Sequence, residues 1–496
     1  MKLFDFPKVR IEKKIRLIEL FGGIGSQAMA LRNIGADFEH YRLVEFDKYC
    51  INSYNSIHHT NFETMDIKNV HGADLGIVEK DRFTYLLTYS FPCTDLSVAG
   101  KMLGMSRKEW EEGKATRSGL LWEVERILTE LPKEQLPDIL LMENVPQVHA
   151  EKNREDFERW LSFLRGKGYY SFWKDLNARD FGIPQNRERC FCVSVLSEDF
   201  VEYEFPKEIP LGTVMKDYLE ETVEEKYYIN NEKADKLIRE LMERNMLQTT
   251  DNRQQTTDNR LCLTVDMSVK SPKEIEVANC ISARTDRGIS NRKSEESGVL
   301  EVKTCVLKNM IDKKQEPTLC QVSKVKRLGN LYGENKGTGF AGNVWDKNNL
   351  CPTIMTMQGG GREPMIIDDV KECKVIGGLG EKKSNNGTQY FQQDRVYFGD
   401  IQPAQPAQPA QLPGGSYNFL LEEAKKYRIR KLTPRECWRL MAFSDEDFDK
   451  AEKVVSNTQL YKQAGNSICV CVLMAIFSQM NIKGVKLWTE VHNEKK

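Results

Sequence analysis

Short runs of hydrophobic residues alternate with helix-like segments over the N-terminal part of the chain. Runs rich in β-branched, aromatic and leucine side chains predict buried strands at 14–20, 41–46, 83–89 and 139–142. Residues 156–165 carry apolar side chains at the spacing of one helix face, namely Phe157, Trp160, Leu161 and Leu164. This alternation is typical of a parallel α/β sheet.

Two further strand-like runs, at 169–176 and 190–196, are joined by a short segment that contains Gly182 and Pro184. They predict an antiparallel hairpin that closes the sheet. Because its second strand would run against the parallel strands, that strand would begin at the edge where the others end.

The pattern changes near residue 206, where polar, turn-rich sequence begins. The QPA triplets within 402–411 favour an extended linker, and apolar helical periodicity returns only at 434–443 and 467–480. We therefore expect an α/β domain at 1–205, an inserted irregular domain at 206–428, and a return segment at 429–496 that completes the first domain. A chain of 496 residues is long enough for this organisation.

Charge and cysteine usage exclude some classes of protein. Lys and Arg number 72 against 73 Asp and Glu, which argues against non-specific coating of nucleic acid. The 13 cysteines include no C-x-x-C pair, so we expect no metal site. Residues 1–14 lack the apolar core of a signal peptide, and the longest apolar run, 468–477, is too short to span a bilayer. We expect a cytoplasmic protein with no membrane partner.

Cys93 is a candidate nucleophile. It follows the strand predicted at 83–89, just beyond Pro92, and a thiol at a strand end is readily activated by a nearby cation or helix N-terminus. The alternative is a packed structural cysteine, which is the commoner role of this residue type.

A glycine-rich turn follows the first predicted strand. Gly23, Gly25 and Ala28 fit the G-x-G-x-x-A dinucleotide pattern, and Glu45 lies twenty residues after Gly25, where an acid can hold ribose hydroxyls. The turn fits an NAD enzyme and a methyltransferase that uses S-adenosylmethionine equally well, and a turn with no cofactor is the third alternative.

Other reactive side chains are predicted at the same sheet edge. Glu143-Asn144-Val145 follows the strand at 139–142, and Arg187 and Arg189 precede the second hairpin strand. Since ligands of open α/β sheets bind at the carboxyl ends of strands, we expect a thiol, a carboxyl group and two guanidinium groups around one crevice beside the glycine turn.

The ordered motifs resemble those of the DNA cytosine-5 methyltransferases of bacteria and phages. The matching segments are Phe21-x-Gly23-x-Gly25, Pro92-Cys93, Glu143-Asn144-Val145, Gln185-x-Arg187-x-Arg189, the run 430–436 (RKLTPRE) and Gly465-Asn466-Ser467. Thr94 departs from the family, which commonly has glutamine there. The resemblance implies a Rossmann-like, S-adenosylmethionine-dependent catalytic domain with an inserted target-recognition domain at 206–428.

The resemblance also implies the chemistry. Cys93 would add to carbon 6 of a cytosine flipped out of duplex DNA, and carbon 5 would then accept the methyl group. Glu143 would bind or protonate ring N3, with Arg189 orienting both the carboxylate and the base, and Arg187 would complete the catalytic group. The partners would be double-stranded DNA and, as a candidate, a cognate restriction endonuclease, and we expect a monomer.

Binding residues follow from the same resemblance. Those expected to line S-adenosylmethionine are Phe21, Gly23, Gly25, Glu45, Phe46, Asp66, Pro92, Leu121 and Asn466. Those expected to contact DNA are Ser97, Lys324, Arg327, Asn343 and Thr353.

Three alternatives stay open at this point. A related RNA methyltransferase would not need so large an insertion. An NAD-linked oxidoreductase would leave Cys93 and the two arginines unexplained. A DNA-binding relative without activity would not need every catalytic residue type to be present.

Overall fold

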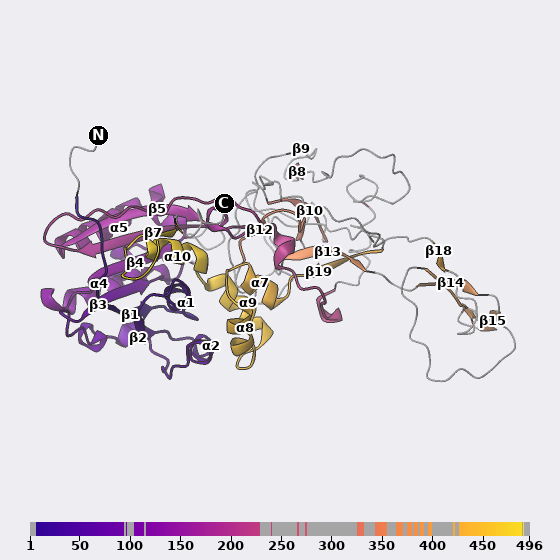
Figure 1. Ribbon diagram of the computed structural model, residues 1–496, viewed down its shortest axis with the longest axis horizontal. Coiled ribbons are helices and arrows are strands. Elements are labelled where there is room, and N and C mark those ends of the chain that lie inside the picture. Colours follow the sequence, from indigo (N-terminus) through magenta and orange to yellow (C-terminus); the bar gives the residue numbers. More distant parts are fainter. Residues whose placement is uncertain are drawn as a thin grey trace.

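The computed structural model describes most of the α/β body and parts of the insertion (Figure 1). The described residues are 6–93, 96, 104–113, 116–228, 240, 265–266, 273–274, 325–331, 343–354, 364–370, 374–378, 381–384, 387–390, 395–398, 420–421, 426–488 and 490.

A six-stranded sheet forms the centre of the body, with strand order β2-β1-β3-β4-β7-β5. Its strands are β1 (Lys14–Leu20), β2 (Phe38–Val44), β3 (Phe83–Tyr89), β4 (Ile139–Asn144), β5 (Tyr169–Asn177) and β7 (Glu188–Leu196). The first four are parallel, and β7 is antiparallel to both β4 and β5. The predicted parallel sheet and its closing hairpin are therefore confirmed.

Strand β2 lies closer to the N-terminus than its hydrophobic run predicts. It begins at Phe38, which pairs with Ile15, and it ends at Val44. The chain turns away there because the Glu45 carboxylate accepts the backbone N–H of Asp47 and that of Gly23. A local side-chain bond therefore overrides strand propensity at this end.

Helices cover both faces of the sheet. The α-helices are α1 (Ser26–Asn33), α2 (Lys48–His58), α3 (Arg107–Glu111), α4 (Leu121–Glu130), α5 (Arg154–Gly166), α7 (Pro434–Arg439), α8 (Asp445–Glu452), α9 (Asn457–Asn466) and α10 (Val470–Ser478). One buried cluster joins α1 and α10 to Leu17 of β1, and a second joins α4 and α5 to Ile18 of the same strand. Neighbouring residues of a strand point to opposite faces, so the body has three layers.

The apolar face predicted at 156–165 lies in α5 and packs on the sheet. Phe157, Trp160 and Leu164 are buried, while Leu161 packs at the margin of the same cluster.

The C-terminal segment packs into the body far from it in sequence. In Figure 1 the yellow helix α10 lies beside the indigo and purple elements of the sheet, and its residues share a buried cluster with α1. The Tyr203 hydroxyl donates to the carbonyl of Ile476, and Arg32 makes a two-point ion pair with Asp447. These contacts support the predicted return segment, whose boundary stays a prediction.

The described parts of the insertion contain short strands. One sheet has the order β10-β11-β13-β19, and its strands are β10 (Arg327–Asn330), β11 (Asn343–Trp345), β13 (Met365–Val370) and β19 (Lys426–Lys431). A second contact pairs β12 (Cys351–Pro352) with β6 (Gln185–Asn186) of the body. The remaining strands are β8 (Val265–Asp266), β9 (Lys273–Glu274), β14 (Lys374–Gly378), β15 (Glu381–Ser384), β16 (Gly387–Tyr390), β17 (Arg395–Phe398) and β18 (Leu420–Leu421).

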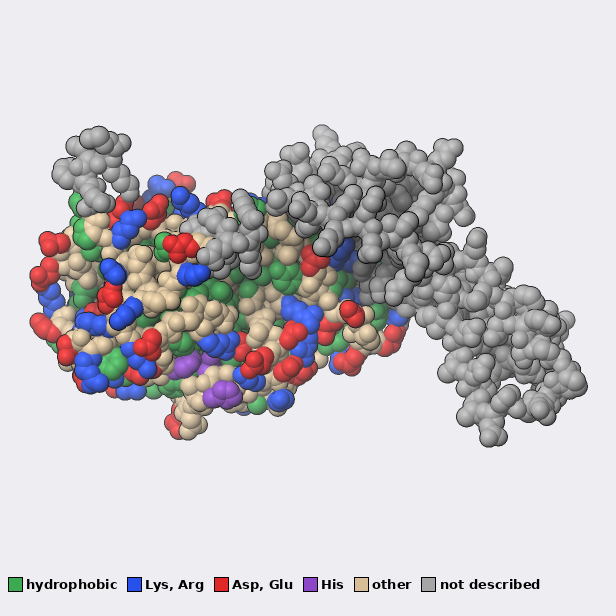
Figure 2. Space-filling view, viewed as in Figure 1, with side chains coloured by type: hydrophobic (Ala, Val, Ile, Leu, Met, Phe, Trp, Pro, Cys, Tyr) green, Lys and Arg blue, Asp and Glu red, His purple; other side chains and the backbone are tan. Residues whose placement is uncertain are grey.

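The charge distribution matches the balanced composition. Figure 2 shows Lys and Arg side chains interspersed with Asp and Glu over the face of the body. Within the described residues, one stretch, Asn457–Ser478, has the length and apolarity of a membrane-spanning helix. It is divided between α9 and α10, and 72% of its apolar window is buried inside the protein, as expected for core helices.

Candidate active site

The carboxyl ends of four parallel strands bring the predicted groups to one edge. The glycine turn follows β1, Glu45 follows β2, Cys93 follows β3, and Glu143 lies near the end of β4. Strand β7 runs in the opposite direction, with Cys190 paired to Asn144, so Arg189 lies at the same edge. The edge predicted from sequence is thus the edge that forms.

The glycine turn has a backbone conformation that residues other than glycine rarely adopt. Phe21, Gly23 and Gly25 have φ values of 58°, 58° and 84°. A Cβ atom on Gly25 would lie 2.4 Å from Nε2 of His58, whereas one on Gly23 would meet nothing within 4 Å. Gly25 therefore permits close packing, and Gly23 turns its backbone toward open space, where a ligand has room.

Helix α1 begins directly after this turn. Its N-cap residue, Gly25, has no side chain that could accept a hydrogen bond, while the buried Glu19 carboxyl group accepts the N–H of Ala28 in the first turn. The free N–H groups at a helix start attract the electron-rich groups of a ligand.

Glu45 links the two turns beside this space. Its Oε2 accepts the N–H of Gly23 at 3.0 Å, and its Oε1 accepts the N–H of Asp47 at 2.9 Å. Burial raises the pKa of Glu45, while these hydrogen bonds lower it. The adjacent Phe46 is 75% exposed, which leaves a bare aromatic face next to the turn.

Three other predicted cofactor residues differ in exposure. Asp66 is exposed and caps the short helix η1 (Ile67–Asn69), next to Met65, whose N–H donates to the carbonyl of Glu45. Leu121 is fully buried at the start of α4. Asn466 is exposed at the end of α9. Lys462 of the same helix forms an ion pair with Asp47, at 2.6 Å, next to Glu45 and Phe46.

Cys93 lies near one carboxyl group, that of Glu143, and two guanidinium groups, those of Arg187 and Arg189. The thiol is half-buried, and Nε of Arg189 lies 3.4 Å from Oε1 of Glu143. Burial raises the pKa of Cys93; the positive charges of Arg189 and Arg187 lower it, and the negative charge of Glu143 raises it further. Burial also raises the pKa of Glu143, opposed by the two arginines. The four groups are therefore electrostatically coupled.

Two polar side chains hold the backbone around Cys93, and sequence reasoning assigned them no role. Nδ2 of Asn144 donates to the carbonyl of Phe91 at 2.9 Å, and the Ser118 hydroxyl donates to that of Pro92 at 2.7 Å. Asn144 belongs to the Glu143-Asn144-Val145 motif, so the sequence contained a signal for its role. No motif surrounds Ser118, so its role could not be predicted from the sequence.

Arg187 lies behind the site and joins three parts of the chain. Its guanidinium donates to the carbonyls of Ile354, Gly465 and Ser467 at 3.0, 3.0 and 2.7 Å. The side chain is buried, and burial lowers its pKa. These hydrogen bonds connect the body to the insertion and to the turn before α10.

The predicted DNA-contacting residues that the structure describes bond within the protein. Nη1 of Arg327 donates to Oδ1 of Asn343 at 3.2 Å, and the Thr353 hydroxyl donates to the carbonyl of Asn186 at 2.6 Å. All three side chains are buried. Ser97 and Lys324 lie outside the described residues, so contact with DNA stays a prediction for all five.

Comparison with known proteins identifies the same family along nearly the whole chain. The model of the C-5 cytosine-specific DNA methylase family matches residues 15–481. An orphan methyltransferase of Bacillus phage SPbeta is 29% identical over 526 aligned positions, which cover 94% of this chain and 97% of the phage protein.

Two other relatives extend the comparison. An orphan methyltransferase of Spiroplasma monobiae is 35% identical over 44% of this chain and 68% of its own length. The solved structure of an Entamoeba histolytica methyltransferase covers 95% of this chain and 98% of its own, with a TM-score of 0.50 at 13% identity, and this likeness supports the fold alone.

Proposed function

The chain belongs to the C-5 cytosine-specific DNA methylase family, and from that premise we propose that Cys93 forms a covalent adduct with a flipped cytosine in duplex DNA. The observation that carries the proposal is the coupling of the Cys93 thiol with Glu143 and Arg189 at the edge beside the glycine turn. An NAD-linked oxidoreductase would have no use for this group.

Carbon 5 of cytosine is a poor nucleophile until the ring is activated. The Cys93 thiolate adds to carbon 6, which makes carbon 5 electron-rich. Because burial raises the pKa of Glu143, this carboxylate takes up a proton more readily than an exposed one, and it can share that proton with ring N3 as negative charge develops. Arg189 holds the Glu143 carboxyl group in place. Once carbon 5 carries the transferred methyl group, loss of the carbon 5 proton and expulsion of Cys93 release the product.

The residues present fit S-adenosylmethionine as the methyl donor. The open space at Gly23, the start of α1 and the exposed ring of Phe46 suit the polar and aromatic parts of an adenosine derivative. When bound, this cofactor supplies the methyl group. The residues proposed to hold it are Phe21, Gly23, Gly25, Glu45, Phe46, Asp66, Pro92, Leu121 and Asn466.

The target base must leave the duplex, because carbon 6 is inaccessible to a thiol inside the base stack. Flipping costs a few kcal/mol of unstacking. We propose that the insertion reads the DNA sequence and that Arg187 fixes the insertion against the catalytic edge through the carbonyl of Ile354.

The names of related proteins bear on the cellular setting of this enzyme. Relatives include proteins named as orphan methyltransferases of phages and as a type II methyltransferase of Lactococcus lactis. Both names fit an enzyme that belongs to, or derives from, a restriction-modification system, with a cognate endonuclease as candidate partner.

Covalent trapping tests the mechanism directly. DNA with 5-fluorocytosine at a mapped target cannot lose a proton from carbon 5, so with S-adenosylmethionine present the wild-type chain should form a complex that survives denaturation. Cys93→Ser should form none and should lose methylation by bisulfite sequencing, while S-adenosylmethionine should still raise its melting temperature. Absence of a trapped complex at a site that is methylated would refute the adduct.

A further inference from the structure

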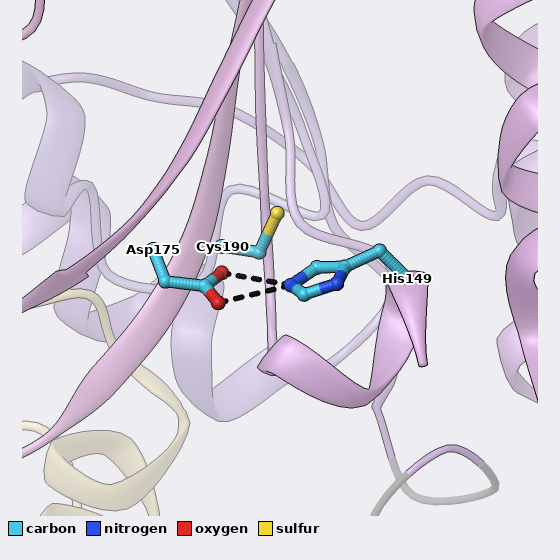
Figure 3. A group of neighbouring side chains, drawn as sticks. All are labelled: His149, Asp175 and Cys190. Atoms are coloured by element: carbon cyan, nitrogen blue, oxygen red, sulfur yellow. Dashed lines mark hydrogen bonds and ion pairs between the residues drawn. The ribbon is translucent and has the colours of Figure 1, made fainter. Parts of the chain in front are cut away.

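A second group of reactive side chains lies beside the catalytic edge and is not used in the mechanism above. It consists of His149, at the end of the short helix η5 (Pro146–His149), Asp175 on β5 and Cys190 on β7 (Figure 3). Cys190 pairs with Asp175 on one side and with Asn144 on the other. The group therefore joins the segment that follows Glu143 to the closing hairpin.

The three side chains converge on one point. Their ligand-type atoms all lie within 4.8 Å of one another, and Nε2 of His149 is 3.1 and 2.9 Å from the two carboxylate oxygens of Asp175. Ligand atoms around a tetrahedral zinc ion are about 3.3–3.8 Å apart, given metal–ligand distances of about 2.0–2.3 Å. An ion would require the His149–Asp175 contact to widen by a few tenths of an ångström and the longest separation in the group, at most 4.8 Å, to shorten by up to about 1 Å.

The surroundings favour a metal site over a freely moving surface pair. The His149 ring lies 4.7 Å from the ring of Trp173 and 6.2 Å from that of Phe157, which holds its orientation. Cys190 is fully buried, while the side chains of His149 and Asp175 are 24% and 29% exposed. An ion could thus enter from solvent and keep one position for water.

We propose that His149, Asp175 and Cys190 bind a divalent transition-metal ion of the zinc type, with a water molecule as the fourth ligand. Imidazole, carboxylate and thiolate are the ligand types that zinc takes in proteins. Binding converts the Cys190 thiol to a thiolate and releases its proton to solvent, with no change in oxidation state. A bound ion would cross-link η5 to β5 and β7, and so fix Glu143 relative to Arg189.

Cobalt(II) is the probe for the thiolate bond, since thiolate-bound Co²⁺ has a charge-transfer band in the near ultraviolet. The full-length chain should show this band at one equivalent of Co²⁺, and Cys190→Ser should lose it. Cys192→Ser is the matched control, because Cys192 is equally buried on the same face of β7, outside the cluster, and should keep it. Absence of the band in the wild type, or its retention in Cys190→Ser, would overturn the assignment.

A second measurement covers the other ligands. Zn²⁺ should raise the melting temperature of the wild type, whereas Mg²⁺, which prefers an all-oxygen site, should not. His149→Gln and Asp175→Asn should each weaken Zn²⁺ binding by at least about tenfold. His71→Gln is the control, since His71 is an exposed histidine paired with Glu130, and its affinity should equal that of the wild type. Unchanged affinity in both ligand variants would contradict the site.

Discussion

The reactivity of Cys93 depends on charges that act in opposite directions. Burial and Glu143 raise the pKa of the thiol, while Arg189 and Arg187 lower it. In the proposed mechanism only the thiolate attacks, so the balance of these residues would set the pH range of the reaction.

Removing Arg189 should shift that range upward. In Arg189→Gln the largest effect that lowers the pKa is lost, so alkylation of Cys93 should require a higher pH than in the wild type. Glu143→Gln removes a negative charge and should shift the profile to lower pH. The measurement is the rate of iodoacetamide labelling of the Cys93 peptide by mass spectrometry across pH. Shifts of the same sign in both variants would contradict the proposed coupling.

Substitution of the two glycines of the turn should have different effects on stability. Gly25→Ala places a Cβ atom 2.4 Å from His58 and 2.7 Å from Tyr54, so it should lower stability by about 1–3 kcal/mol through overpacking, in addition to backbone strain. Gly23→Ala meets no neighbouring atom, so it should lower stability only through the strain of its positive φ, by about 1–2 kcal/mol.

Cofactor binding separates the two variants further. Gly23→Ala fills the space proposed for the ligand, so it should weaken S-adenosylmethionine binding by calorimetry more than its loss of stability accounts for. Thermal denaturation without cofactor supplies the stability comparison. Equal cofactor affinity in Gly23→Ala and the wild type would remove this turn from the binding site.

At the scale of elements, the junction between β19 and α7 depends on one buried ion pair. Arg430 binds both oxygens of Glu436 at 2.8 and 2.9 Å, with side chains 1% and 0% exposed. Glu436 also caps α7 by accepting the N–H of Thr433. The pair thus joins β19, the strand that spans the predicted boundary at residue 428, to the first helix of the return segment.

Breaking this pair should be costly. Glu436→Gln removes the carboxylate charge that faces the buried guanidinium of Arg430, so we expect a loss of about 3–5 kcal/mol in urea denaturation. Asp445→Asn is the control, since Asp445 forms a more exposed pair with Arg439 nearby, and it should cost about 0–1 kcal/mol. Similar losses in the two variants would indicate that the buried pair has no special role.

At the scale of the whole molecule, specificity and chemistry are proposed to lie in different parts of the chain. The catalytic groups are in the body, whereas the insertion contacts that body through β12 with β6 and through Ile354 with Arg187. Sequence readout and methyl transfer should therefore be separable.

Exchange of the insertion tests this separation. Replacing 206–428 with the corresponding region of the Bacillus phage SPbeta relative, which aligns over 94% of this chain, should move methylation to the relative's site. Cofactor affinity should stay unchanged, because the proposed cofactor residues lie outside the exchange. The readout is bisulfite sequencing of DNA from cells that express the chimera. A folded chimera that kept the original site would place sequence readout in the body.

Local pattern determined much of this protein. The hydrophobic runs located the strands of the central sheet, since burial on both faces requires such runs, and strand direction then placed the glycine turn, Glu45, Cys93, Glu143 and Arg189 at one edge. The motifs identified the family because their order and residue types reflect shared chemistry.

Only the tertiary structure decided which distant groups meet. The carbonyls bound by Arg187 lie 167 to 280 residues away, and the convergence of His149, Asp175 and Cys190 depends on the register of β4, β7 and β5. The expectation of no metal site rested on the lack of paired ligand spacing in the sequence, whereas the proposed site would form from single ligands that strand pairing brings together. Such contacts arise from packing of the whole chain, which local periodicity does not encode.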